Sequence, residues 1–163
     1  NSVASFRLAQ PVSLSNKDVA MCIVGTKGKD KIIGSDASEM LMGGSGKNIL
    51  KGGSSADGFM FDELSDYGKK VADKIRDFSA DEGDKIFLSK GIVGLGDKIM
   101  YKSISGEDFS KRAVKSNKQF LYNEGNGRLY FNENGSDEGW GDGGYLAKLN
   151  GAPDLDSGDF SIV

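Results

Sequence analysis

Four oxygen-bearing side chains recur every nine residues in the chain, namely Asp30, Glu39, Asn48 and Asp57. Each follows a polar, glycine-rich stretch and precedes a short apolar one. Carboxylate and amide oxygens are the donors that hard metal cations prefer. Side chains of this length can also reach a neighbouring turn of the backbone. The chemistry that this spacing allows therefore depends on the elements that repeat with it.

Other kinds of site chemistry lack the residues that they need. The 163 residues include no histidine and one cysteine, which excludes Ser-His, Cys-His and His-zinc sites and an internal disulfide within this chain. Cys22 lies in the apolar run 19–24, which predicts a buried thiol. The stretch 43–48 lacks the Ser or Thr of a phosphate-binding loop, and 154–158 lacks the later glutamate of an EF-hand. With no catalytic constellation, the sequence predicts that the chain is not an enzyme.

The repeating unit is a nonapeptide, which occurs four times in succession between Gly25 and Met60. Every unit begins with glycine, and its last three residues have an apolar side chain in the middle. These middle residues are Ile32, Leu41, Leu50 and Phe59. The pattern predicts a polar turn followed by a short strand, with the middle side chain pointing into a narrow roll. The fourth position is Ala37 and Ser55 in two units, where a positive φ would cost about 1 kcal/mol.

The nonapeptides resemble the RTX, or haemolysin-type, repeat GGxGxDxUx, a calcium-binding parallel β-helix pattern. The resemblance implies two repeats per coil, with calcium held between stacked turns by backbone carbonyl groups and by the sixth residue of each repeat. One site would use Thr26, Gly28, Asp30, Gly43, Ser45 and Asn48. The opposite site would use Ser35, Ala37, Glu39, Gly52, Ser54 and Asp57.

The repeats depart from the family pattern in their charge. Only Asp30 and Asp57 keep the aspartate, since Asn48 is neutral and Glu39 is one methylene longer. The stretch 25–60 has five lysines against four acids, whereas typical members are much more acidic. We therefore expect weak or partial calcium binding, with the Glu39–Asp57 site the stronger on charge. The alternative is a roll that keeps its shape without metal.

The segments 55–61, 73–79 and 83–89 are similar to those that close the calcium roll in serralysin-type proteases. This resemblance implies that Asp73 or Asp77 supplies a side chain to a terminal calcium. The alternative is that both acids terminate strands.

Short strands continue to the end of the chain. They are expected at 98–101, 120–122, 129–131 and 145–149, with a hairpin turn at 123–128. The expected fold class is all-β: a short parallel β-roll of the RTX type, closed by a C-terminal antiparallel β segment. The expected parts are N-terminal cap strands at 1–24, the roll at 25–62 and the closing segment at 63–163.

The last residues, 159–163, resemble the acidic-then-apolar tail of type I secretion substrates. This resemblance implies a secreted or cell-surface protein with the type I export apparatus as a partner. The tail also fits a last edge strand, and the two interpretations are compatible. Residues 1–5 show no basic-plus-apolar leader, and no apolar run is long enough to span a membrane. We expect a fragment or processed part of a larger bacterial protein.

The function expected is a non-catalytic, calcium-binding RTX module that folds on calcium after export. An uneven charge distribution favours an alternative, because 123–163 has a net charge of −6 while lysines concentrate around the repeats. These lysines are Lys27, Lys29, Lys31, Lys47, Lys51, Lys69, Lys70 and Lys74. The alternative is an anionic-polysaccharide-binding module similar to the R-modules of mannuronan epimerases. Lysines on a single face of the roll would favour it, and no nucleic-acid partner is expected.

Overall fold

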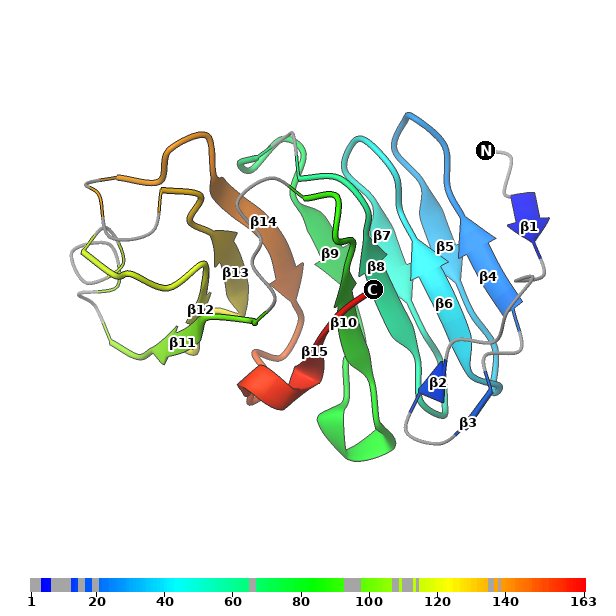
Figure 1. Ribbon diagram of the computed structural model, residues 1–163. Coiled ribbons are helices and arrows are strands. Elements are labelled where there is room, and N and C mark those ends of the chain that lie inside the picture. Colours follow the sequence, from blue (N-terminus) through cyan, green and yellow to red (C-terminus); the bar gives the residue numbers. More distant parts are fainter. Residues whose placement is uncertain are drawn as a thin grey trace.

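A computed structural model describes residues 4–6, 13–14, 17–18, 21–64, 67–92, 98–106, 109, 113, 115–134, 137 and 139–163. These residues form β-strands and two 3-10 helices, η1 (Ala80–Glu82) and η2 (Ser157–Asp159), and two sheets face each other across a common core (Figure 1). The all-β class is thereby confirmed. In the described part of the chain, no helix has the length and apolarity needed to cross a membrane.

The first sheet has the strand order β1-β4-β6-β8-β10-β15. Its strands are β1 (Ala4–Phe6), β4 (Met21–Val24), β6 (Glu39–Met42), β8 (Gly58–Phe61), β10 (Lys85–Leu88) and β15 (Phe160–Ile162). Neighbours are parallel except at one edge, where β1 is antiparallel to β4. Strand β1 of the N-terminal part therefore forms one edge of this sheet.

The second sheet has the order β11-β12-β13-β14-β9-β7-β5 and runs the length of the molecule (Figure 1). Its strands are β5 (Lys31–Ile33), β7 (Ile49–Lys51), β9 (Asp73–Ile75), β11 (Tyr101–Ile104), β12 (Phe120–Asn123), β13 (Arg128–Phe131) and β14 (Gly144–Leu149). Strands β5, β7, β9 and β14 are parallel in turn, whereas β12, β13 and β14 are antiparallel. The closing segment is therefore mixed and not antiparallel throughout as expected, since β10 pairs in parallel with β15 and β11 with β12. Strands β12, β13 and β14 continue the sheet of β5, β7 and β9. Two short strands, β2 (Ser13–Leu14) and β3 (Lys17–Asp18), form a separate ribbon.

The nonapeptides wind as a roll because successive strands go to alternate sheets. Met21 of β4 pairs with Glu39 of β6, and Lys31 of β5 pairs with Ile49 of β7, so that one coil takes 18 residues in both sheets. Two repeats therefore make one coil, as the RTX resemblance implied. The number of residues between paired positions is larger in the last coil, where Gly58 pairs with Lys85 and Ile49 with Lys74.

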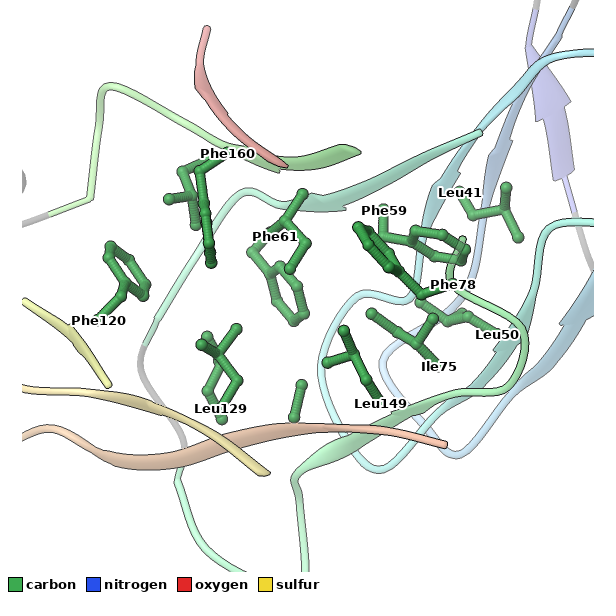
Figure 2. Packing of buried hydrophobic residues seen from close by; sticks show 14 of the residues in the cluster. Leu41, Leu50, Phe59, Phe61, Ile75, Phe78, Phe120, Leu129, Leu149 and Phe160 are labelled. Carbon is green, nitrogen blue, oxygen red and sulfur yellow. The ribbon is translucent and has the colours of Figure 1, made fainter. Parts of the chain in front are cut away.

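The core lies between the two sheets and is continuous from the roll into the closing segment (Figure 2). The middle side chain of each repeat strand points inward, and Leu41 and Phe59 are fully buried. Burying such a side chain contributes about 1.5–3 kcal/mol. Phe160 of β15 meets Phe120 of β12, with ring centroids 5.6 Å apart, so an aromatic contact joins the sheets at the closing end.

The last residues form an edge strand, as one interpretation of the sequence expected. Strand β15 pairs in parallel with β10, and Val163 donates its N–H to the Leu88 carbonyl. The hairpin of β12 and β13 lies where it was predicted, with Asn123 paired to Arg128. The prediction of a strand at 98–101 was too early in the sequence. Strand β11 begins at Tyr101, which pairs with Phe120.

Candidate metal centre

The sixth residue of each repeat links one coil to the next through a backbone hydrogen bond. Asn48 Oδ1 accepts the N–H of Asp30 at 3.0 Å, and Asp57 Oδ1 accepts the N–H of Glu39 at 2.9 Å. All four residues are buried. A carboxylate or amide is therefore needed at this position to satisfy a buried N–H, whether or not a metal is bound.

Two acids of the last coil extend these links. Asp73 Oδ1 accepts the N–H of Asn48 at 2.7 Å, and Asp84 Oδ1 accepts the N–H of Asp57 at 2.8 Å. The roll thus has two turn edges. We call them the Asn48 edge (turns 25–30 and 43–48, with Asp73) and the Asp57 edge (turns 34–39 and 52–57, with Asp84).

The first glycine of each repeat lies where the two coils approach most closely. A Cβ added to Gly25 would collide with the Gly43 carbonyl oxygen and lie 3.0 Å from Asp30 Oδ2. A Cβ on Gly34 would likewise collide with the Gly52 carbonyl oxygen. The carbonyl groups of Gly43 and Gly52, both predicted calcium donors, therefore point at the preceding turn on their respective edges.

Further predicted donors also point into the space between turns. The carbonyl oxygens of Thr26 and Gly28 face Gly44 and Gly46, at 2.6 and 2.7 Å from the positions of added Cβ atoms. Both of these glycines have positive φ, 75° and 93°. On this edge the structure therefore gathers three of the carbonyl groups that the resemblance assigned to one site.

On the Asn48 edge, protein groups already satisfy the side-chain oxygens. Asp30 Oδ2 accepts hydrogen bonds from the Thr26 N–H at 2.7 Å and from the Thr26 hydroxyl at 2.8 Å. Asn48 Nδ2 donates to the Gly44 carbonyl at 3.1 Å, so the amide directs N–H groups toward the turn. An amide N–H group that points at a bound cation would be repelled by it. On this edge, hydrogen bonds alone join the groups of the turns.

The Asp57 edge has one carboxylate oxygen without a partner. Asp57 is 1% exposed, and its Oδ2 forms no hydrogen bond. In the turns 25–30 and 34–39, the second residue donates its N–H to the acid of its own turn, as Ser35 does to Glu39 Oε2 at 3.0 Å. In the Asp57 turn, Asp77 accepts the N–H groups of both Gly52 and Gly53 at 3.0 Å. Asp57 Oδ2 is left unpaired for this reason.

Burial and neighbouring acids make the charged form of Asp57 costly. Desolvation raises the pKa of Asp57 to about 7, and the negative charges of Asp84, Glu39 and Asp77 add to the effect. Desolvation also raises the pKa of Asp84 to about 6. A cation on this edge would offset both causes.

Other contacts on the Asp57 edge join its turns directly. The Ser54 N–H donates to the Ser35 carbonyl at 3.1 Å, and the Ser54 hydroxyl donates to Asp36 Oδ1 at 3.2 Å. Ser55 donates its hydroxyl to the Asp36 carbonyl at 2.9 Å and has the positive φ expected of it, 74°. Ala37, expected to share that strain, is not among the residues of positive φ, and its N–H donates to the Ser35 hydroxyl at 3.1 Å.

The remaining predicted residues lie near the Asn48 edge. Ser45 lines a cavity of about 310 Å³ together with Thr26, Asp62 and Asp73. Desolvation raises the pKa of Asp73 to about 6, which Asn48 partly counters by hydrogen bonding. Asp73 therefore lies beside the turns, where its Oδ1 accepts the backbone N–H of Asn48.

Sequence reasoning missed the roles of Asp84 and Asp77 on the Asp57 edge. Asp84 follows Asp57 by 27 residues, which is an odd number of nonapeptides, and a regular roll with two repeats per coil would place it on the opposite edge. The longer last coil brings it to Asp57, so the repeat spacing gives no signal for this role. Asp77 was considered for a terminal calcium, but it binds the two glycine N–H groups of the turn.

The residues of the Asp57 edge fit a hard cation better than those of the Asn48 edge. Within the described residues, no three acidic or cysteine side chains converge as a metal cluster by themselves. A site here would combine the unpaired Asp57 oxygen with backbone carbonyl groups, which are ligands that calcium accepts.

Comparison with protein-family models matches residues 3–152 to the family described as "Peptidase M10 serralysin C terminal". The match covers the roll and most of the closing segment. A search among curated proteins gave no match.

Proposed function

Because the chain belongs to the serralysin C-terminal family of M10 peptidases, we propose that it is a calcium-binding RTX module of an exported bacterial protein. The family is that of the C-terminal repeat domain and not of the catalytic domain, which is compatible with a non-catalytic role. The observation that carries the proposal is the buried, unpaired Asp57 Oδ2.

Within this proposal the Asp57 edge holds the calcium. Asp57 supplies its free oxygen, and on the same edge the carbonyl group of Gly52 faces Gly34 and that of Ser35 faces Gly53. Glu39 and Asp84 stay engaged with the backbone and contribute negative charge. Calcium would supply the positive charge that lowers the cost of burying these acids. On the Asn48 edge the side-chain oxygens already form hydrogen bonds within the protein. Calcium would therefore occupy only one of the two predicted sites.

The proposal extends to export and location. A module that gains stability from calcium remains less folded in the calcium-poor cytosol and folds where calcium is plentiful. This supports secretion through the type I apparatus to the outside or the cell surface, with the 159–163 tail as the recognised segment. Because 159–163 includes the strand β15, recognition of the tail would take place before the chain folds.

The first experiment is a calorimetric calcium titration of chelator-treated protein, followed by far-UV circular dichroism. Asp57→Asn keeps the oxygen that accepts the Glu39 N–H but removes the negative charge. We expect it to weaken calcium binding at least 10-fold, which corresponds to about 1.4 kcal/mol. Asp154→Asn, an exposed aspartate of the closing segment, is the matched control and should bind as the parent does.

A third variant tests the difference between the edges. Asn48→Asp replaces the N–H donor with a second carboxylate oxygen, so we expect it to add a binding event on the Asn48 edge. The proposal fails if the parent binds no calcium at millimolar concentration while its spectrum is already folded. It also fails if Asp57→Asn and Asp154→Asn bind calcium equally.

A further inference from the structure

Two asparagine–glycine pairs lie in turns of the closing segment, Asn126–Gly127 and Asn150–Gly151. An asparagine in such a pair can lose its side-chain amide, because the glycine that follows has no side chain to obstruct its own main-chain nitrogen. The reaction starts when that nitrogen attacks the side-chain carbonyl carbon of the asparagine. Its rate in a folded protein therefore depends on whether the glycine N–H is free and whether the chain around it has room to rearrange. A third pair begins at Asn134, but its glycine lies outside the described residues.

The surrounding structure holds the first pair in place. The N–H of Gly127 donates to the Asn123 carbonyl at 2.8 Å. Asn126 Oδ1 accepts the Arg128 N–H at 3.1 Å, so the side chain is fixed as well. A Cβ added to Gly127 would collide with the Leu149 carbonyl oxygen, which shows that another part of the chain packs closely against this glycine. Attack here would require a hydrogen bond to break in a crowded turn.

The second pair is open. Among the described residues, neither the N–H of Gly151 nor the side-chain amide of Asn150 has a hydrogen-bond partner. Gly151 is exposed and Asn150 is partly exposed. A Cβ added to Gly151 would meet nothing within 4 Å. The turn is closed by a long hydrogen bond, from the Ala152 N–H to the Leu149 carbonyl at 3.4 Å. The attacking nitrogen, the amide and water therefore have room to react.

We infer that Asn150 is a deamidation site, at which aspartate and isoaspartate replace asparagine in the folded protein. The Gly151 nitrogen passes its proton to water and forms a bond to Asn150 Cγ. The amide nitrogen takes up a proton and leaves Cγ as ammonia, so that a cyclic succinimide remains. Water then opens the ring at either carbonyl carbon. Opening at Cγ gives aspartate, and opening at the main-chain carbonyl carbon gives isoaspartate, whose main chain runs through Cγ.

The modification would change the chain between two anchored points. On one side, Leu149 of β14 pairs with Ile75 of β9. On the other side, the Pro153 carbonyl accepts the Tyr122 hydroxyl at 2.8 Å. Isoaspartate adds a methylene group to the main chain between these points, and both products add a negative charge to the segment 123–163, whose net charge is already −6. The path from β14 to β15 thus lengthens as the protein ages. This inference is independent of calcium binding at the turns.

The test is incubation of the folded protein in mildly alkaline, calcium-containing buffer, with peptide mapping by mass spectrometry at successive times. Replacement of the amide by a carboxyl group raises the mass of the peptide, and chromatography separates its aspartate and isoaspartate forms. The Asn126 peptide of the same sample is the internal control. A chain unfolded in guanidinium chloride and incubated alike is the second control. Asn150→Gln identifies the signal of this residue, because glutamine would have to form a larger and less favourable ring.

In the folded protein we expect Asn150 to react at least about fivefold faster than Asn126, the ratio that corresponds to one hydrogen bond of about 1 kcal/mol. In the unfolded chain the two sites should react within about twofold of each other, because neither is held. Isoaspartate should form together with aspartate, since direct hydrolysis of the side chain would give aspartate alone.

The inference is overturned if Asn150 stays intact in the folded protein while it reacts in the unfolded chain. It is also overturned if Asn126 reacts as fast as Asn150 in the folded protein. The same ratio of rates in the folded and unfolded chains would overturn it as well, because the structure would then have no part in selecting the site.

Discussion

Asp57 differs from the other repeat acids in what its two oxygens contact. Oδ1 accepts the Glu39 N–H, whereas Oδ2 is buried without a partner. Asp30, at the same place in its own turn, has its outer oxygen satisfied by Thr26. The difference comes from Asp77, which accepts the N–H groups that would otherwise serve the Asp57 turn. A buried carboxylate in this state raises the energy of the metal-free fold.

The calcium-free protein should therefore lose stability as the pH rises. In the folded chain the pKa is about 7 for Asp57 and about 6 for Asp73 and Asp84, against 3.8 for an ordinary aspartate. An acid with a raised folded pKa contributes stability below its unfolded pKa, and loses it as the pH rises through the folded value. Between pH 5 and pH 8 we expect a loss on the order of 1–2 kcal/mol, after allowance for solvent screening.

Urea unfolding in chelator at the two pH values measures this loss. The Asp57→Asn variant should show a smaller pH dependence than the parent, because its side chain no longer titrates. Saturating calcium should reduce the loss in the parent. Equal stability of the calcium-free parent at pH 5 and pH 8 would contradict this account.

At the scale of the element, the close approach of the turns decides which glycines are required. Gly34→Ala would place a Cβ against the Gly52 carbonyl oxygen and 2.6 Å from Glu39 Oε2. Backbone oxygens cannot move away cheaply, so we expect a loss of about 2–3 kcal/mol in the free energy of unfolding. Gly28→Ala is the control, because its Cβ would meet nothing closer than Thr26 Oγ1 at 3.8 Å.

Urea unfolding of both variants at saturating calcium separates the two positions. Gly28→Ala should unfold within about 0.5 kcal/mol of the parent, as exposed substitutions usually do. Similar losses in both variants would show that the first glycine is not special and that the turn as a whole resists substitution.

The elements of the roll could be predicted because sequence period and structural period coincide. Position eight of each nonapeptide had to be buried, and Ile32, Leu41, Leu50 and Phe59 are all buried. The β12–β13 hairpin was predictable for a similar local reason, its glycine-rich turn. Strand β11 was misplaced because its position depends on pairing with β12, a contact distant in sequence.

The candidate site could be predicted only in part. The nonapeptide spacing identified the sixth residues but not which of their oxygens would find partners. That depends on Asp77 and Asp84, which enter from the longer last coil, outside the regular repeat. The pairing of β14 with the roll was likewise hidden, because Lys148 lies far along the chain from Lys74 and becomes its neighbour only through sheet pairing.

At the scale of the whole molecule, Phe160 fastens the two sheets together at the closing end. Its ring lies 5.2 Å from that of Tyr101 and 5.6 Å from that of Phe120, and the side chain is 6% exposed. Phe160→Ala would leave a cavity between the sheets, so we expect a loss of about 3 kcal/mol in the free energy of unfolding. Ile33→Ala is the control, since Ile33 is 54% exposed at the opposite edge.

Differential scanning calorimetry at saturating calcium reports this loss and also whether the molecule unfolds in one step. A single, lower transition for Phe160→Ala would agree with one continuous core. Two separate transitions in the parent protein would instead show that the roll and the closing segment unfold independently, and that Phe160 does not couple them.

The 18-residue coil limits how such a chain can change its length during evolution. Inserting a single nonapeptide would send every later strand to the opposite sheet and exchange the residues of the two turn edges. Strands β9 and β14 would move together and keep their pairing, but the closing segment would then continue the sheet of β4 and β6 instead of the sheet of β5 and β7. Inserting two nonapeptides would leave every later strand in its own sheet. Relatives in which the closing segment continues the same sheet as here should therefore differ from this chain by even numbers of repeats.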